Sequence, residues 1–182
     1  MPQGTPALQG DAGFSRKGPA ERQASRYYSR PQLRTTGEFR VDGARVAVVN
    51  SYREPGMERY WIPSIPESSL FGTRISDRFF LINQGSDVAF LNGALTHLLA
   101  NDWIDHDFIR EHTHGFDALR ESVERMSWEE IEAQCGVPRM EIQAFGNMLA
   151  EARRGVLVWS MGVTQHETGV ANVQAIINLG LA

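Results

Sequence analysis

Three short segments carry side chains suited to binding a polar heterocycle or a phosphate group. They are residues 50–53, 85–87 and 161–166. Each lies after an apolar run typical of a buried strand in a parallel sheet. Ligands of open α/β sheets bind outside the carboxyl ends of such strands, where helix N-termini point outward. We therefore predict that these three segments meet at one binding edge.

The first segment offers an amide and a guanidinium group. Asn50 directly follows its predicted strand, at a point where many nucleotide-binding folds place a polar group near the ribose. Arg53 has the planar fork that binds phosphate. The alternative is that these residues only form a turn, as polar residues after a strand commonly do.

The second segment combines a flexible backbone with a carboxylate. Gly85 allows the backbone to approach a ligand closely, and Asp87 can accept two N–H hydrogen bonds from the edge of guanine. The alternative is a purely structural use, in which Ser86 and Asp87 cap the following helix.

The third segment is rich in hydrogen-bonding groups. Met161 and Gly162 can admit a planar ring against the backbone, and Thr164, Gln165 and His166 supply donors and acceptors for a heterocycle or a diphosphate. A capped loop with a solvated Gln and His explains the same spacing equally well.

Three short apolar runs predict the strands that would position these segments. Residues 45–50, 79–82 and 156–159 predict three buried strands. Between the first two lies a long, proline-containing stretch, residues 51–72, whose aromatic side chains should pack on another part of the molecule.

Helical periodicity and capping residues occupy the rest of the chain. Apolar residues recur at helical spacing from Val88 to Leu99, and again over residues 170–181. Shorter helices are predicted after Asp105, after the capping box that Ser127 begins, and from Pro138. The element order predicts an α/β fold, a Rossmann-like layered domain with parallel strands that forms part of a larger enzyme.

Bulk properties narrow the classes of protein and partner. The chain has 182 residues and a formal net charge of −4, which predicts one folded unit and argues against nucleic acid as the main partner. No apolar run approaches the roughly 20 residues of a membrane span. The single cysteine, Cys135, fits a reducing compartment, so we predict a cytoplasmic protein. Residues 1–38 are poor in aliphatic side chains and predict a disordered or unrelated leader.

Metal binding and catalysis find little support among the residue types. His106, His112 and His114 are close in sequence, but their spacing matches no zinc arrangement, so we predict no metal ligand. Cys135 precedes a glycine at a predicted helix end and is expected to fill space in the core. We predict no catalytic residue in this chain.

Taken together, the segments resemble the molybdopterin oxidoreductases, the family that includes the catalytic alpha subunits of formate dehydrogenases. The resemblance covers residues 41–182 in order and includes an aromatic insert typical of a formate-dehydrogenase-like branch. It runs through GSDVAFLNGALTHLLANDWIDHDFIREHTHGFDAL, SWEEIEAQCGVP and WSMGVTQHETGVANVQAIINLGLA.

The resemblance implies a domain that holds a guanine dinucleotide arm of bis(molybdopterin guanine dinucleotide), the molybdenum cofactor. Ser51 departs from the commoner pattern, which has proline there, so the contacts of the first segment stay open. The implied cofactor-binding residues are Asn50 and Arg53 for the dinucleotide, Gly85 and Asp87 for the guanine, and Met161, Gly162 and Gln165 for the pterin and pyrophosphate.

A larger enzyme is also implied. Family members are several times longer and contain a molybdenum ligand, and often iron–sulfur cysteines, that do not appear in this sequence. We therefore expect a fragment of a molybdopterin-dependent oxidoreductase that is inactive alone, binds no iron–sulfur cluster, and acts on a small molecule such as formate only within the full enzyme.

Two alternatives remain at this point. The chain could be a non-enzymatic binding module derived from such a domain, or an unrelated nucleotide-binding α/β protein. In either the family case or the module case, a sheet without neighbouring strands exposes unpaired edges, so we expect poor solubility of the isolated chain.

Overall fold

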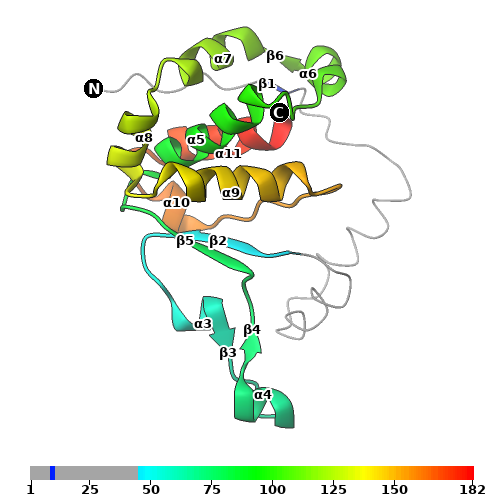
Figure 1. The fold of residues 1–182 in the computed structure, drawn as a ribbon, viewed down its shortest axis with the longest axis vertical. Helices are drawn as coiled ribbons and strands as arrows, with labels where there is room; N and C mark the ends of the chain where they lie inside the picture. Colours follow the sequence, from blue (N-terminus) through cyan, green and yellow to red (C-terminus); the bar gives the residue numbers. More distant parts are fainter. Residues whose placement is uncertain (1–8, 11–44) are drawn as a thin grey trace. The chain divides into compact units, whose positions relative to one another are not determined.

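The computed structural model describes residues 9–10 and 45–182 (Figure 1). The chain divides into two compact units. The helical unit comprises Val49–Tyr52 and Phe80–Ala182 together with residues 9–10. The insert unit comprises Arg53–Phe79 together with residues 45–48. The leader predicted over residues 1–38 lies, apart from residues 9–10, outside the described part of the chain.

Helices dominate the helical unit, and short elements make up the insert unit. The helices of the helical unit are α5 (Asp87–Ala100), α6 (His106–His112), α7 (Phe116–Glu124), α8 (Trp128–Cys135), α9 (Arg139–Ala150), α10 (Met161–Thr164) and α11 (Gly169–Leu181). Its short strands β1 (Gln9–Gly10) and β6 (Thr113–His114) pair antiparallel. The insert unit contains α3 (Pro55–Glu58), β3 (Arg59–Tyr60), α4 (Pro66–Phe71) and β4 (Thr73–Arg74).

Strands β2 (Ala47–Asn50) and β5 (Arg78–Leu81) pair in parallel. Near their starts, the Asp77 N–H donates to the Val46 carbonyl at 2.8 Å. At their ends, the Ile82 N–H donates to the Asn50 carbonyl at 3.0 Å. The predicted α/β class with parallel strands is therefore confirmed. β2 is half-buried instead of buried on both faces as predicted.

The third predicted strand is wrong. Residues 156–159 form no strand, and none of the described strands pairs with them. Val156 and Val158 are largely exposed, Val158 by 87%. An apolar run becomes a strand only where a neighbouring backbone offers hydrogen bonds, and the sequence pattern alone does not report that neighbour.

Helix α5 forms the centre of the helical unit. It packs against α7, α8, α9 and α11 (Figure 1) and is apolar on nearly every side, as a helix surrounded by others must be. Phe90 from α5 meets Phe80 and Phe145, with ring centroids 5.1–5.6 Å apart. Gly93 brings α5 close to its neighbours, because a Cβ there would lie 2.9 Å from the Ile131 side chain. The predicted helix is confirmed, and the aromatic cluster packs it against Phe80 of β5.

Aromatic side chains of the insert unit remain exposed. Tyr60 and Trp61 are about half exposed, and Phe71 is 72% exposed. These rings were predicted to be covered by packing, and within the insert unit they are not. Its helices and strands are two to six residues long, too short to bury a large ring on both faces.

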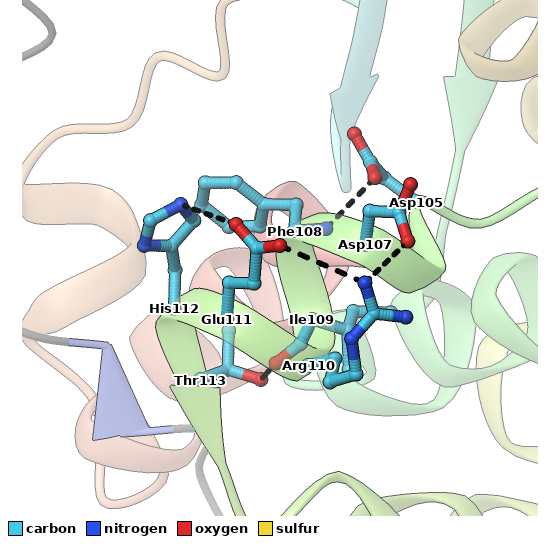
Figure 2. A network of polar contacts seen from close by, with 8 residues as sticks. All are labelled: Asp105, Asp107, Phe108, Ile109, Arg110, Glu111, His112 and Thr113. Carbon is cyan, nitrogen blue, oxygen red and sulfur yellow. Dashed lines mark hydrogen bonds and ion pairs between the residues drawn. The ribbon is translucent and has the colours of Figure 1, made fainter.

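Helix α6 shows a completed helix start (Figure 2). The Asp105 carboxylate accepts the Phe108 N–H at 2.9 Å, as predicted from its position before the helix. Arg110 pairs with Asp107 at 2.7 Å on the exposed face. Within the described residues, no helix is both long and apolar enough to cross a membrane.

Candidate functional site

The carboxyl end of β2 forms one side of the predicted binding edge. Asn50 lies beside Ile82 because the two strands are hydrogen-bonded there. The Asn50 side-chain oxygen accepts the Ser51 N–H at 2.8 Å, which is the turn-forming use considered for this residue. Its side chain is half-buried, so Asn50 supports the backbone of the edge while its binding role stays a prediction.

The turn after β5 is tied firmly to helix α8. The Asn83 N–H donates to the Cys135 carbonyl at 2.8 Å, and the Asn83 side chain donates to the Gln134 carbonyl at 3.0 Å. Gly136, with φ of +69°, leaves room for this amide, since a Cβ there would lie 2.7 Å from it. Asn83 therefore holds the edge in place and was not among the predicted site residues.

Gly85 and Ser86 prepare the start of α5. Gly85 has φ of +78°, a conformation that favours glycine, and a Cβ added there would have no heavy atom of a non-neighbouring residue within 4 Å. Ser86 occupies the N-cap position, but its side chain makes no cap hydrogen bond. Its hydroxyl instead donates to the Asn83 carbonyl at 2.6 Å.

Asp87 is the first residue of α5, and its carboxylate makes no hydrogen bond within the described fold. It caps no backbone N–H and forms no hydrogen bond or ion pair with the other described residues. Its side chain is only half-buried. The structural alternative predicted for this segment, a side-chain helix cap, is therefore wrong, because the turn beginning at Asn83 already fixes the helix start.

Arg53 belongs to the insert unit and has partners there. Its guanidinium group pairs with the Glu58 carboxylate and lies over the Phe79 ring, 5.2 Å from the centroid. A phosphate at Arg53 would compete with Glu58 for the same donors. Because Arg53 and the other candidates lie in different units, their joint use stays a prediction.

Met161, Gly162 and Gln165 lie on or next to α10, a four-residue helix where a loop was expected. All three are exposed. The Gln165 side-chain nitrogen lies 3.7 Å from the Met161 sulfur, so the two side chains are together on one surface. A Cβ at Gly162 would meet nothing within 4 Å, although its backbone conformation does not require glycine.

Helix α11 holds α10 through residues that the sequence reading missed. The Asn172 side chain donates to the Val163 carbonyl at 3.1 Å. Gly169 permits the close approach, because a Cβ there would lie 2.2 Å from the Thr164 carbonyl oxygen. The signal available in the sequence was an asparagine at a position of α11 that its apolar periodicity places in the core.

Groups with metal-binding chemistry do not gather in the described residues, where no three His, Cys, Asp or Glu side chains lie together. His106 bonds Asp102 at 2.6 Å on the surface. Cys135 is fully buried, and burial raises the pKa of its thiol. It fills space at the end of α8, as expected.

The structure brings the candidate residues of the helical unit together in two groups. Asn50 is hydrogen-bonded to the segment that leads to Gly85 and Asp87, and Met161 contacts Gln165. Asp87 and Gln165 are both accessible. Helix α10 packs on α11, and α11 packs on α5. Helix α11 therefore connects α10, which carries Met161, with α5, which begins at Asp87.

Comparisons with known proteins give this arrangement a context. Protein YdeP from Escherichia coli (strain K12) is 33% identical over 149 residues, which are 75% of this chain and 20% of that protein. Formate dehydrogenase H from the same organism is 32% identical over 108 residues, 59% of this chain and 15% of that enzyme. The chain is related to the molybdopterin oxidoreductase family. It spans only 20% and 15% of the length of these two relatives.

The fold of this chain also occurs in a solved enzyme structure. Acetylene hydratase from Pelobacter acetylenicus superposes with a TM-score of 0.63 and 17% sequence identity, over 78% of this chain and 18% of the hydratase. At that identity the likeness concerns the fold alone. No family model matches the chain.

Proposed function

We propose that this chain is part of a molybdopterin-dependent oxidoreductase and binds a guanine dinucleotide arm of the molybdenum cofactor. The observation that carries the proposal is the carboxylate of Asp87. It stands at the carboxyl end of a parallel strand pair, is accessible, and has no partner among the described residues. A carboxylate whose oxygens accept no hydrogen bond from the described residues is suited to bind a ligand at such an edge.

Charge favours guanine over phosphate at this position. The N-terminus of a helix attracts anions, but a carboxylate in its first turn already occupies that favourable field and repels a phosphate. The guanine edge carries N–H donors, and an ionised carboxylate only accepts hydrogen bonds. Asp87 therefore selects the base end of the dinucleotide.

The glycines of the edge fit a flat, closely bound group. At Gly85 and at Gly162, a Cβ would point into space free of other residues. Neither glycine is needed to avoid a clash within the protein. Both positions would allow a ring or its linker to reach the backbone without a side chain in the way.

We assign the remaining residues by the same reasoning. Met161 and Gln165 form one surface patch that combines a polarisable thioether with an amide, which suits the pterin and its linked pyrophosphate. Asn50 shapes the edge, and Arg53 would contact the dinucleotide only by sharing its guanidinium with Glu58.

The cofactor, when bound, supplies electron transfer at molybdenum, and the protein orients it. We propose that this chain provides orientation only and does not turn over by itself. A small-molecule substrate such as formate would be handled by the full enzyme. A cytoplasmic location and the absence of nucleic-acid and membrane partners stay predictions.

The test is to purify the chain from a host that makes the molybdenum cofactor, release the nucleotide with acid, and quantify GMP and the oxidised pterin. We expect GMP in the wild-type protein and at least a tenfold loss in Asp87→Asn, which keeps the shape of the side chain but removes its charge and replaces one acceptor oxygen with an N–H donor.

The matched control is Asp117→Asn. Asp117 lies in the first turn of α7, is exposed, and stands outside the candidate site. It should leave the GMP content unchanged. Wild-type protein that carries pterin without GMP would contradict the guanine assignment, and protein without either would favour the non-enzymatic binding module.

A further inference from the structure

Helix α10 cannot be stable without support. Its four residues form little more than one turn, and isolated helices of this length do not persist in water. Its candidate ligand-binding side chains, Met161 and Gln165, are exposed and add no packing. Whatever fixes α10 therefore decides where these two side chains lie.

Asn172 on α11 supports α10. It projects from α11, is 0% exposed, and its side-chain N–H donates to the Val163 carbonyl at 3.1 Å. Carbonyl groups in the last turn of a helix lack partners within the helix. The Asn172 amide therefore satisfies a group that α10 cannot satisfy itself.

The oxygen of the Asn172 amide, unlike its nitrogen, makes no hydrogen bond with the described residues. This Oδ1 atom is buried. A buried acceptor without a partner is unfavourable, and an apolar side chain of similar size would avoid that cost. Packing of α11 therefore does not explain an asparagine here, whereas the bond to α10 does.

We propose that Asn172 is a positioning residue of the cofactor site. It acts through the Val163 carbonyl, holding α10 so that Met161 and Gln165 face the bound group, and it does not touch that group itself. This inference rests on the proposed function for the identity of the ligand, but the link from Asn172 to α10 stands independently of it.

The first arm of the test needs no cofactor. In the full chain, Asn172→Leu removes the bond to α10 together with the unpaired acceptor. We expect the midpoint of global unfolding to stay unchanged or rise. The Gln165 amide, which donates to the Met161 carbonyl, should exchange with solvent roughly fivefold to tenfold faster.

Asn178→Leu is the matched control, since Asn178 is the other asparagine fully buried on α11. Its substitution should leave Gln165 exchange unchanged. Asn172→Asp provides a second variant, because a carboxylate keeps the shape but cannot donate to the Val163 carbonyl; it should also accelerate exchange at Gln165.

The second arm measures GMP and pterin in the same proteins purified with cofactor. We expect at least a threefold loss in Asn172→Leu and none in Asn178→Leu. Unchanged Gln165 exchange in Asn172→Leu would overturn the inference, and so would faster exchange with full cofactor content. Wild-type protein without cofactor would defeat the proposed function instead, and the exchange arm would still decide the role of Asn172.

Discussion

Two helix starts in the helical unit use the same kinds of residue in opposite ways. At α8, the Ser127 hydroxyl accepts the Glu130 N–H, and the Glu130 carboxylate accepts the Ser127 N–H at 2.9 Å. At α5, Ser86 points back to Asn83 and Asp87 has no described partner. A serine and a carboxylate complete the fold at one start and leave a carboxylate available at the other.

The difference between the two starts comes from their surroundings. The turn before α5 is already held by the bonds of Asn83 to the end of α8, so a side-chain cap is not needed there. Helix α8 instead begins with its own capping box, in which Ser127 and Glu130 satisfy each other's backbone N–H groups. Glu130 is explained by the helix cap that it completes, whereas Asp87 completes no cap. Asp87 is therefore the better candidate for a binding role.

The largest expected effect is a difference in thiol reactivity between the buried end of α8 and the exposed turn before α5. Cys135 at the buried end of α8 has a raised pKa and little thiolate at neutral pH, so it should react with Ellman's reagent slowly. A Gln84→Cys variant, at the exposed turn before α5, should react on the order of a hundredfold faster. Equal rates would show that the end of α8 is not sealed.

Alanine substitutions test whether the space beside Gly85, before α5, is empty and the space beside Gly136, after α8, is occupied. Gly85 and Gly136 both have positive φ, so alanine should cost about 1 kcal/mol at each. At Gly136 alanine must also displace the Asn83 amide, for a total of about 2 kcal/mol. Chemical denaturation measures both, and a larger loss at Gly85 would reverse the comparison.

Cap removal gives a smaller contrast. Ser127→Ala and Asp105→Ala each delete an observed cap and should lower the free energy of unfolding by about 1 kcal/mol. Asp87→Asn should lower it by at most about 0.5 kcal/mol, because only the interaction with the helix dipole is weakened. A full kilocalorie at Asp87 would mean that its carboxylate is structural after all.

The smallest effect concerns pH. Hydrogen bonds from the Ser127 backbone and hydroxyl lower the pKa of Glu130 below its ordinary value of 4.5. The stability that these bonds contribute is complete above pH 4.5 and is lost as the pH falls through the lowered pKa. The difference in thermal midpoint between wild type and Glu130→Gln should therefore shrink below pH 4.5. A difference that stays constant down to pH 2 would exclude this origin.

Local patterns predicted much of the fold correctly. The capping box at Ser127, the cap at Asp105 and the apolar periodicity of α5 all depend on residues within a few positions of one another. Residues 156–159 could not be judged in this way, because a strand depends on a distant partner. The exposure of Trp61 was missed for a similar reason, since it depends on what surrounds the insert.

The candidate site divides along the same line. Gly85, Asp87, Met161 and Gln165 could be chosen from residue type and from the family resemblance, and their roles as cofactor contacts await the tests above. Asn172 could not be chosen, because its role depends on an unpaired oxygen and on a bond to another helix.

By itself, the sequence determined where α5, α6, α8, α9 and α11 begin, which side chains have ligand-binding chemistry, and which enzyme family the chain resembles. Tertiary structure alone decided which of those side chains stay available. Caps form within four residues and can be read locally, whereas the bond from Asn83 to Gln134 joins residues 51 positions apart. That distant bond holds the turn before α5, where the Asp87 carboxylate makes no hydrogen bond with the other described residues.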